Sequence, residues 1–362
     1  MSCSSLAKLF APVVFRSGIT WRNSFMLAPL TNQQSYPDGT LSEDELQWLS
    51  YRSEGGFGLV MTCASHVQQI GQGFEGQLGI FSDIHLPGLT KLASSIRKHG
   101  AISSVQIHHA GIRAPMALTG KQPVGPSAES STGARGLSRD EVLQLRDDFI
   151  AAAVRAEKAG FDGVQIHGAH GYILCDFLSP QYNHRSDDYG GSLSNRARII
   201  WEIIDGIKQN TQPNFQIGVR ISAERYGLVF ADQLEFAKQL LLSNKIDYLD
   251  VSCWDSFKQP EDMLFKGKTL TEWFSSLPRG DTKLGVAGKI YSAQDCLKVL
   301  EQGADIPIIG RAALLHYNFP ERVRTDATFK TQELPVTREY LREQRLGPKF
   351  VEYMSRWPNF VK

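Results

Sequence analysis

The stretch DGVQIHGAHGYILCDFLSP, residues 162–180, joins a short apolar segment directly to a group of polar side chains. Its first five residues, rich in Val and Ile, are typical of a buried strand. The amphipathic segment 142–160 precedes them, and His167, His170 and Tyr172 follow at once. A helix, a buried strand and then reactive side chains predict one β/α unit of a parallel sheet, with functional groups at the carboxyl end of its strand.

The same alternation of short apolar runs and longer amphipathic segments recurs along most of the chain. Runs that are apolar on both faces are typical of parallel strands. Eight β/α units over roughly 250 residues or more are the usual size of a closed barrel, whereas an open doubly wound sheet fits six strands better. We therefore predict the α/β class and a single (β/α)8 TIM barrel, with strands at 25–30, 57–62, 102–107, 162–166, 215–221, 248–252, 283–287 and 305–310.

Helix start signals lie between these strands. Ser42 with Glu45 and Ser138 with Glu141 have the spacing of capping boxes. Further helices are predicted at 87–99, 195–209, 231–244 and 292–302. Because no composition shift marks a linker, we expect residues 1–334 to form one barrel domain and residues 335–362 to be a C-terminal tail.

Composition excludes several classes of protein. The 362 residues include 39 Lys+Arg and 38 Asp+Glu, so no basic excess indicates a nucleic-acid partner. No apolar run is long enough to predict a membrane span, and the start MSCSSLAKLF lacks a secretory signal, which predicts a cytoplasmic protein. Five cysteines without CxxC spacing disfavour a zinc ribbon, an iron–sulfur cluster or a disulfide framework.

The segment GQGFEG, residues 71–76, matches the GxGxxG dinucleotide pattern literally. That pattern predicts a phosphate loop only where it joins a strand directly to a helix. Nine residues separate it from the preceding apolar run, and QLGIFSDIHLPG follows in place of a helix. We therefore reject it as a phosphate loop.

The residues after the fourth predicted strand are candidate catalytic groups, because barrel enzymes place reactive side chains at the carboxyl ends of strands. Two imidazoles, His167 and His170, can donate hydrogen bonds to one oxygen, and the Tyr172 hydroxyl can deliver a proton. An HxxH pair can also hold zinc, but Cys175, Asp176 and His184 do not stand at a recognised ligand spacing. No metal is predicted.

The seventh and eighth predicted strands each end in glycine, at Gly288 and Gly310, and Arg311 follows the second. This placement predicts a phosphate site at the barrel mouth. Pro29 and Thr31 follow the first strand, Gln106 ends the third and Arg220 lies in the fifth. An arginine buried in a strand needs an anionic partner, and an amide suits the edge of a heterocycle. Flavin mononucleotide (FMN) fits this set of residues.

The signature HGAHGYILCDFLSPQYNHRSDDYGGSLSNRAR, residues 167–198, resembles that of the old yellow enzyme family of FMN-dependent ene-reductases, in its bacterial-type branch. Supporting segments are RNSFMLAPLT (22–31), VQIHHAG (105–111), VRIS (219–222) and IIGRA (308–312), and together they cover nearly the whole barrel. The resemblance implies that the isoalloxazine contacts Ala28, Pro29, Thr31, Ala64, Gln106 and Arg220, and that the phosphate binds Gly288, Gly310 and Arg311. It also implies that His167 and His170 bind the substrate carbonyl and that Tyr172 donates the proton.

Two residues depart from the branch pattern. Thr31 stands where many relatives have cysteine, and Gln33 where a tyrosine often lines the substrate pocket. The tail also differs, so an arginine from a neighbouring subunit is not carried over, and the sequence leaves a homo-oligomer open.

The function implied is an NADPH- or NADH-dependent FMN oxidoreductase that reduces activated alkenes, with small-molecule substrates. One alternative is a flavin-free barrel that uses a histidine as acid/base on a phosphorylated small molecule. The other, a flavin-binding module without turnover, is disfavoured by the presence of both histidines and Tyr172.

Overall fold

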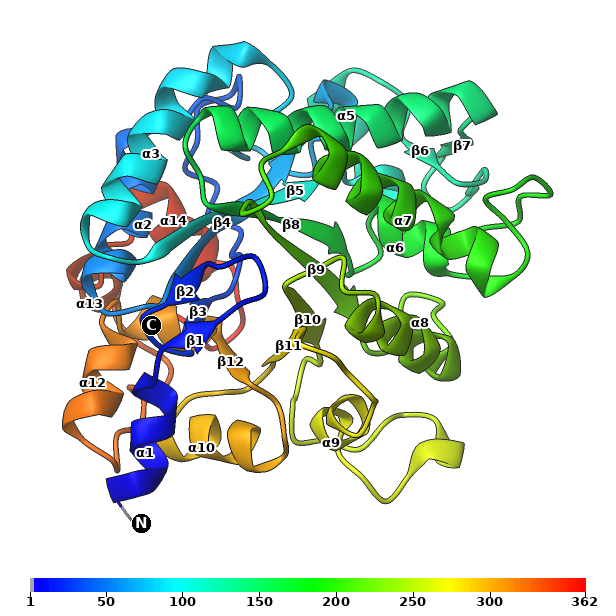
Figure 1. Ribbon diagram of the computed structural model, residues 1–362. Helices are drawn as coiled ribbons and strands as arrows, with labels where there is room; N and C mark the ends of the chain where they lie inside the picture. The colour runs from blue at the N-terminus through cyan, green and yellow to red at the C-terminus, as the bar shows by residue number, and fades with distance from the viewer. Residues whose placement is uncertain (1–2) are drawn as a thin grey trace.

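The computed structural model describes residues 3–362, with side chains from Leu6 onward. Eight parallel strands close into one barrel in the order β10-β11-β12-β3-β4-β5-β8-β9 (Figure 1). The predicted (β/α)8 fold is confirmed, and each predicted strand overlaps an observed one. The strands are β3 (Met26–Leu27), β4 (Leu59–His66), β5 (Ile102–His108), β8 (Gly163–Gly168), β9 (Gln216–Ser222), β10 (Tyr248–Ser252), β11 (Lys283–Ala287) and β12 (Ile306–Ile309).

Helices surround the barrel because each has one apolar stripe that only the outer face of the strands can bury. In α3, Leu89, Leu92, Ala93 and Ile96 form this stripe. None of the helices in residues 3–362 carries an apolar stretch long enough to cross a bilayer. The surrounding helices are α2 (Glu43–Glu54), α3 (Leu86–Lys98), α5 (Arg139–Lys158), α7 (Leu193–Asn210), α8 (Phe230–Leu242), α9 (Leu270–Ser275), α10 (Ala293–Glu301), α11 (Arg311–Leu315) and α12 (Phe319–Thr325).

Only one of the two predicted capping boxes forms completely. Ser138 and Glu141 satisfy each other's backbone N–H groups at the start of α5. At α2 the Ser42 side chain accepts from Glu45 N, but the Glu45 carboxylate turns inward to Ser35 and to Asn32 Nδ2 at 2.9 Å. The prediction at Ser42 was therefore half wrong, because the Glu45 carboxylate binds these buried polar partners in place of the N-cap N–H. Desolvation raises the pKa of Glu45.

Shorter elements occupy the loops that follow the barrel strands. After β5 the chain runs through η3 (Gly111–Arg113), α4 (Met116–Thr119), β6 (Val124–Gly125) and β7 (Arg135–Gly136), and after β8 through α6 (Ile173–Leu178). The rejected GQGFEG segment overlaps the 3-10 turn η1 (Gln69–Gly71) and leads to the turn η2 (Asp83–His85), so it does not join a strand to a helix. The last loop turn is η4 (Met263–Phe265).

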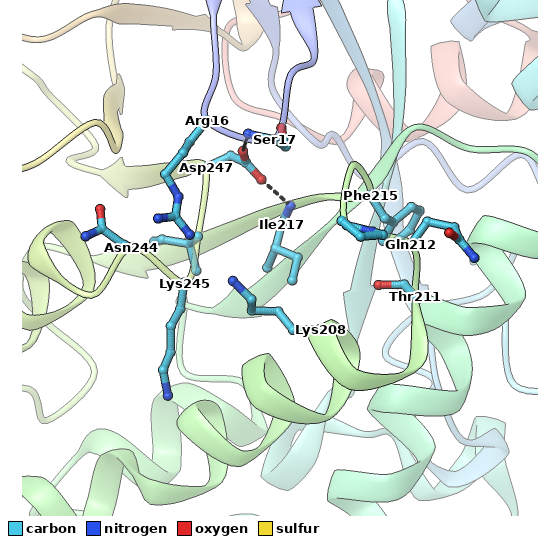
Figure 2. A pocket seen from close by; sticks show the side chains of 12 residues that line it. Arg16, Ser17, Lys208, Thr211, Gln212, Phe215, Ile217, Asn244, Lys245 and Asp247 are labelled. Atoms are coloured by element: carbon cyan, nitrogen blue, oxygen red, sulfur yellow. Dashed lines mark hydrogen bonds between the residues drawn. The ribbon is translucent and has the colours of Figure 1, made fainter.

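The amino-terminal end of the barrel is closed by the hairpin β1 (Val13–Val14) and β2 (Thr20–Trp21), which follows α1 (Cys3–Phe10). Trp21 packs edge-on against Tyr248 of β10, with ring centroids 5.5 Å apart, and its Nε1 donates to Gln216 Oε1 at 3.1 Å. A cavity of about 160 Å³ lies beside this plug, where Asp247 accepts from Ser17 N and Ile217 N (Figure 2). Barrel enzymes place their active sites at the opposite end, so this cavity is structural.

The C-terminal tail contains α13 (Arg338–Glu343) and α14 (Pro348–Ser355). Its residues Leu341, Phe350 and Met354 are buried in the same apolar cluster as the outer faces of the barrel strands. Arg52 of α2 fastens the tail, because its Nη2 donates to Gln344 O at 2.9 Å. The tail is therefore packed against the barrel.

Replacing Arg52 with Ala is expected to lower the free energy of unfolding by roughly 2–4 kcal/mol. The guanidinium is fully buried and also donates to Ala313 O at 2.9 Å, so its loss leaves buried carbonyl oxygens without donors. Urea unfolding measures the change. Lys91→Ala, which breaks an exposed 2.9 Å ion pair with Glu43, is the control and should change stability by less than about 1 kcal/mol. Equal losses in the two variants would contradict the role of Arg52.

Candidate active site

A cavity of about 410 Å³ opens at the carboxyl ends of the barrel strands, within the range of about 300–1,000 Å³ typical of ligand sites. Nine of the residues predicted from the sequence line it: Ala28, Pro29, Thr31, His170, Tyr172, Arg220, Gly288, Gly310 and Arg311. Three others, Ala64, Gln106 and His167, do not line it directly, although they lie at the carboxyl ends of the neighbouring strands β4, β5 and β8. Gln33 lines a separate surface hollow with Glu75 and Glu352.

His167, His170 and Tyr172 pack together at one wall of the site, where His170 and Tyr172 line the cavity. The His167 ring centroid lies 5.1 Å from that of His170 and 5.4 Å from that of Tyr172. His170 has a φ of 65°, a conformation that non-glycine residues rarely adopt, and its backbone N–H donates to Ser222 Oγ at 2.9 Å. Its Nε2 lies 2.8 Å from Ser252 Oγ. Ser222 and Ser252, each at the end of its strand, thus hold the His170 ring beside the rings of His167 and Tyr172.

Burial keeps these three groups in their neutral forms at neutral pH. Desolvation lowers the pKa of His167 and of His170 well below the usual value, and Arg220 lowers both further. Desolvation raises the pKa of Tyr172, while the nearby Arg113 partly opposes the rise. Neutral imidazoles and a protonated phenol can all donate hydrogen bonds, so the wall can bind an oxygen atom that gains negative charge.

A chain of polar side chains crosses the barrel interior beneath the cavity. Gln106 Nε2 donates to Gln165 Oε1 at 2.7 Å, and Gln165 Nε2 donates to Asp250 Oδ2 at 3.1 Å. The same Asp250 oxygen lies 3.1 Å from Arg220 Nε. The anionic partner that a buried Arg220 requires is therefore supplied within the protein. This chain holds the Gln106 amide and the Arg220 guanidinium in place.

The seventh and eighth strand ends meet on another side of the cavity. Gly288 has a φ of 151°, and a Cβ there would lie 2.7 Å from the Trp254 carbonyl carbon, so only glycine fits. At Gly310 a Cβ would meet nothing closer than 3.9 Å, which leaves room beside its backbone. Arg311 packs on the Tyr291 ring, 5.4 Å from its centroid. These features suit a bound phosphate.

Ala64 and Gln106 are neighbours on paired strands, next to an irregularity in β4. Gln77 Nε2 donates to Ala64 O at 2.8 Å and also lies 3.1 Å from His108 Nδ1. The His108 ring packs edge-on against Tyr172, with centroids 4.4 Å apart. The residues behind the cavity thus support the Tyr172 ring. Among the described side chains, from Leu6 to Lys362, no three His, Cys, Asp or Glu groups are placed to hold a metal ion.

Sequence reasoning missed several residues that line the cavity. Ser252 ends the sixth strand, where the rule that located His167 would have found it. The others lie in loops or in the tail, and no local pattern marks them as functional: Arg113, Tyr226, Trp254, Tyr291, Tyr353 and Trp357.

A closed (β/α)8 barrel with these hydrogen-bond donors, and a phosphate-compatible glycine pair at the same mouth, has the features expected of a flavin-dependent oxidoreductase. Residues 8–329 match the family described as the NADH:flavin oxidoreductase / NADH oxidase family. The chain therefore belongs to this family, that of the old yellow enzyme, as its signature predicted.

Similar proteins agree with this assignment. The chain is 36% identical over 327 residues, 87% of each chain, to the Bacillus subtilis protein named "Probable NADH-dependent flavin oxidoreductase YqiG". It is 33% identical over 343 residues to an NADPH dehydrogenase of the same species, covering 92% of this chain and 98% of the relative. The old yellow enzyme homologue of Zymomonas mobilis superposes with a TM-score of 0.78 at 26% identity, covering 95% and 99% of the two chains.

The protein is thus an FMN-dependent NAD(P)H oxidoreductase, and its own residues fit the cofactor. His167 Nδ1 and Asp250 Oδ1 are buried polar atoms without partners among the described residues. The Arg311 guanidinium has no carboxylate within 4.0 Å among the residues that the structure describes, so it is available to a bound phosphate. The flavin-free alternative is therefore set aside.

Acid should destabilise the protein because buried histidines resist protonation. Burial lowers the pKa of His66 from 6.5 to about 4, so its contribution to stability is complete above pH 6.5 and is lost as the pH falls toward 4. In His66→Gln the loss of unfolding free energy between pH 7 and pH 4.5 should be smaller by about 2–3 kcal/mol. Denaturant titrations at both pH values measure it. The exposed control His184→Gln should match the parent, and a parental profile in His66→Gln would contradict the prediction.

Proposed function

We propose that this enzyme reduces the C=C bond of α,β-unsaturated carbonyl or nitro compounds. The observation that carries the proposal is the cluster of His167, His170 and Tyr172. The ring centroids of His170 and Tyr172 lie 5.1 and 5.4 Å from that of His167, and these two residues line the cavity. Two neutral imidazoles can hold one carbonyl or nitro oxygen. The phenol can then reach an atom of the same substrate.

The assignment of the cofactor contacts is also a proposal. Ala28, Pro29 and Thr31 would contact the isoalloxazine from the end of β3, and Ala64, Gln106 and Arg220 from the interior. Gly288, Gly310 and Arg311 would hold the phosphate. When bound, FMN supplies a hydride acceptor for NAD(P)H and a hydride donor for the alkene.

The protein's own residues then control charge and protons. His167 and His170 donate hydrogen bonds to the carbonyl oxygen and stabilise the negative charge that develops when the β carbon receives hydride. Tyr172 gives its phenolic proton to the α carbon. Burial raises the pKa of Tyr172, so the phenol stays protonated until it transfers its proton to the carbanionic α carbon.

Tyr172→Phe separates the two half-reactions. The variant keeps the ring and its contact with His108 but loses the acidic hydrogen. Stopped-flow traces should show normal flavin reduction by the nicotinamide, while reoxidation by 2-cyclohexenone slows by about a hundredfold or more, the effect of losing a general acid. FMN affinity should be nearly unchanged.

A nitroalkene provides the control for this experiment. Its product after hydride transfer is a nitronate, which is stable enough to leave the site unprotonated. Its hydride step should therefore slow much less in Tyr172→Phe. Equal slowing of both half-reactions, or of both substrates, would show that Tyr172 is a packing residue.

Arg311→Ala tests the phosphate site. A charge-assisted hydrogen bond is worth about 1.5–3 kcal/mol, so the Kd for FMN should rise by a factor of roughly ten to a hundred. Fluorescence titration of the apoprotein with FMN measures it. Lys208→Ala, beside the cavity at the opposite end of the barrel, should leave the Kd unchanged. An unaltered Kd in Arg311→Ala would place the phosphate elsewhere.

A further inference from the structure

The cavity wall is positively charged and contains no acidic side chain. Four cations line it, Arg113, Arg220, Lys289 and Arg311, and no Asp or Glu does. Asp250 neutralises Arg220 from behind at 3.1 Å, and Asp255 pairs with Lys289 at 3.0 Å. Arg311 is assigned above to the cofactor phosphate. Arg113 is left with no carboxylate within 4.0 Å among the described residues, and the proposed function gives it no role.

Arg113 lies at the substrate end of the cavity. It ends the turn η3, and its Nε donates to Gly171 O at 2.7 Å. Gly171 stands between His170 and Tyr172 in the chain, so this bond fixes the guanidinium beside the proposed carbonyl-binding wall. The Tyr226 ring packs against Arg113, with its centroid 5.5 Å from Arg113 Cζ, and Tyr226 also lines the cavity.

The contacts of Arg113 use only part of its hydrogen-bonding capacity. The bond from Nε accounts for a structural role in holding Gly171. Neither Nη group donates to another described residue, and the residue is exposed at the cavity. Asp176 is close enough for Arg113 to affect its pKa, but desolvation raises that pKa well above the usual value. Neither carboxylate oxygen of Asp176 has a hydrogen-bond partner among the described residues, so Asp176 does not bind the guanidinium.

We infer that Arg113 binds a carboxylate of the substrate, so that the preferred activated alkenes are anionic, such as 4-oxo-2-enoates. This inference rests on the proposed function. The planar guanidinium presents two Nη groups, which match the two oxygens of a carboxylate. A carboxylate on the alkene would lie beside Arg113 while the ketone oxygen meets the two histidines.

A phosphate of the nicotinamide nucleotide is the other anion that enters this cavity. In that molecule a ribose separates the first phosphate from the reacting ring. Arg113, in contrast, is bonded to the residue directly before the proton donor Tyr172. A carboxylate within a few bonds of the alkene matches this position better, and the experiment below includes both anions.

The test compares (E)-4-oxopent-2-enoate with its methyl ester, which has the same alkene but no charge. With the FMN-loaded parent, kcat/KM should be higher for the acid. Arg113→Gln should lower kcat/KM for the acid by roughly tenfold to a hundredfold, the effect of losing a charged hydrogen bond. It should change kcat/KM for the ester by less than about threefold. Arg113→Lys, which keeps the charge, should retain part of the preference.

Arg225→Gln is the matched control. Arg225 also lies at the barrel mouth and packs on an aromatic ring, that of Trp254 at 5.2 Å, but it is paired with Glu261 and does not line the cavity. Arg225→Gln should leave kcat/KM unchanged for both the acid and the ester. Equal losses for acid and ester in Arg113→Gln would overturn the inference, and so would a selective loss in flavin reduction by NADPH, which would assign the anion to the nucleotide.

A binding measurement separates this inference from the proposed function. Calorimetric titration of the oxidised holoenzyme with 4-oxopentanoate and its methyl ester requires no turnover. The acid should bind more tightly to the parent, and high salt should reduce this difference. An equal affinity for acid and ester overturns the role of Arg113 even if the Arg113→Gln variant does not fold. Failure of the parent to reduce the ester and 2-cyclohexenone would overturn the proposed function alone.

Discussion

The buried ion pair between Arg220 and Asp250 is the constraint on which the interior of the barrel depends. The two residues face each other in register on β9 and β10, and an unpaired charge at this depth would cost several kcal/mol. Gln165 donates to the same oxygen of Asp250 that faces Arg220, and it connects the network to Gln106 on β5. The barrel therefore has a polar layer beneath its mouth, above the apolar plug of Trp21 and Tyr248. That layer holds both proposed flavin-edge contacts before any ligand binds.

The strands could be predicted from the sequence because burial on both faces leaves a local signature. That signature also located His167 and Gly310 at strand ends and Arg220 within a strand. Other features depend on packing between distant segments. Glu45 has the spacing of a capping box, yet its carboxylate accepts from the amide of Asn32, which is buried beside it. Arg113 and Tyr353 reach the cavity only because a loop and the tail turn back over the mouth. No short-range pattern encodes such a turn.

Charge and burial act together on the hydrogen-bonding wall. The positive charges around the cavity favour an anionic ligand, and the same charges lower the pKa of His170 beyond the effect of burial. Neutral imidazoles next to fixed guanidinium groups are a consistent arrangement, because a protonated histidine there would face repulsion as well as desolvation. For Tyr172 the two effects oppose each other, since Arg113 lowers a pKa that burial raises. The phenol thus keeps its proton while its conjugate base is partly stabilised.

Helix α2 connects two walls of this site that are far apart in the sequence. Its Glu45 binds Asn32 and Ser35, in the segment that begins with Pro29 and Thr31. Two turns later, on the same helix face, Arg52 binds the carbonyl oxygens of Ala313 in α11 and Gln344 in the tail. The bond from Arg52 to Ala313 fixes α11, the helix that begins at Arg311. The bond from Arg52 to Gln344 fixes the segment leading to α14, from which Tyr353 borders the cavity. Because both side chains are fully buried, a shift of α2 would move the flavin side and the substrate side of the cavity together.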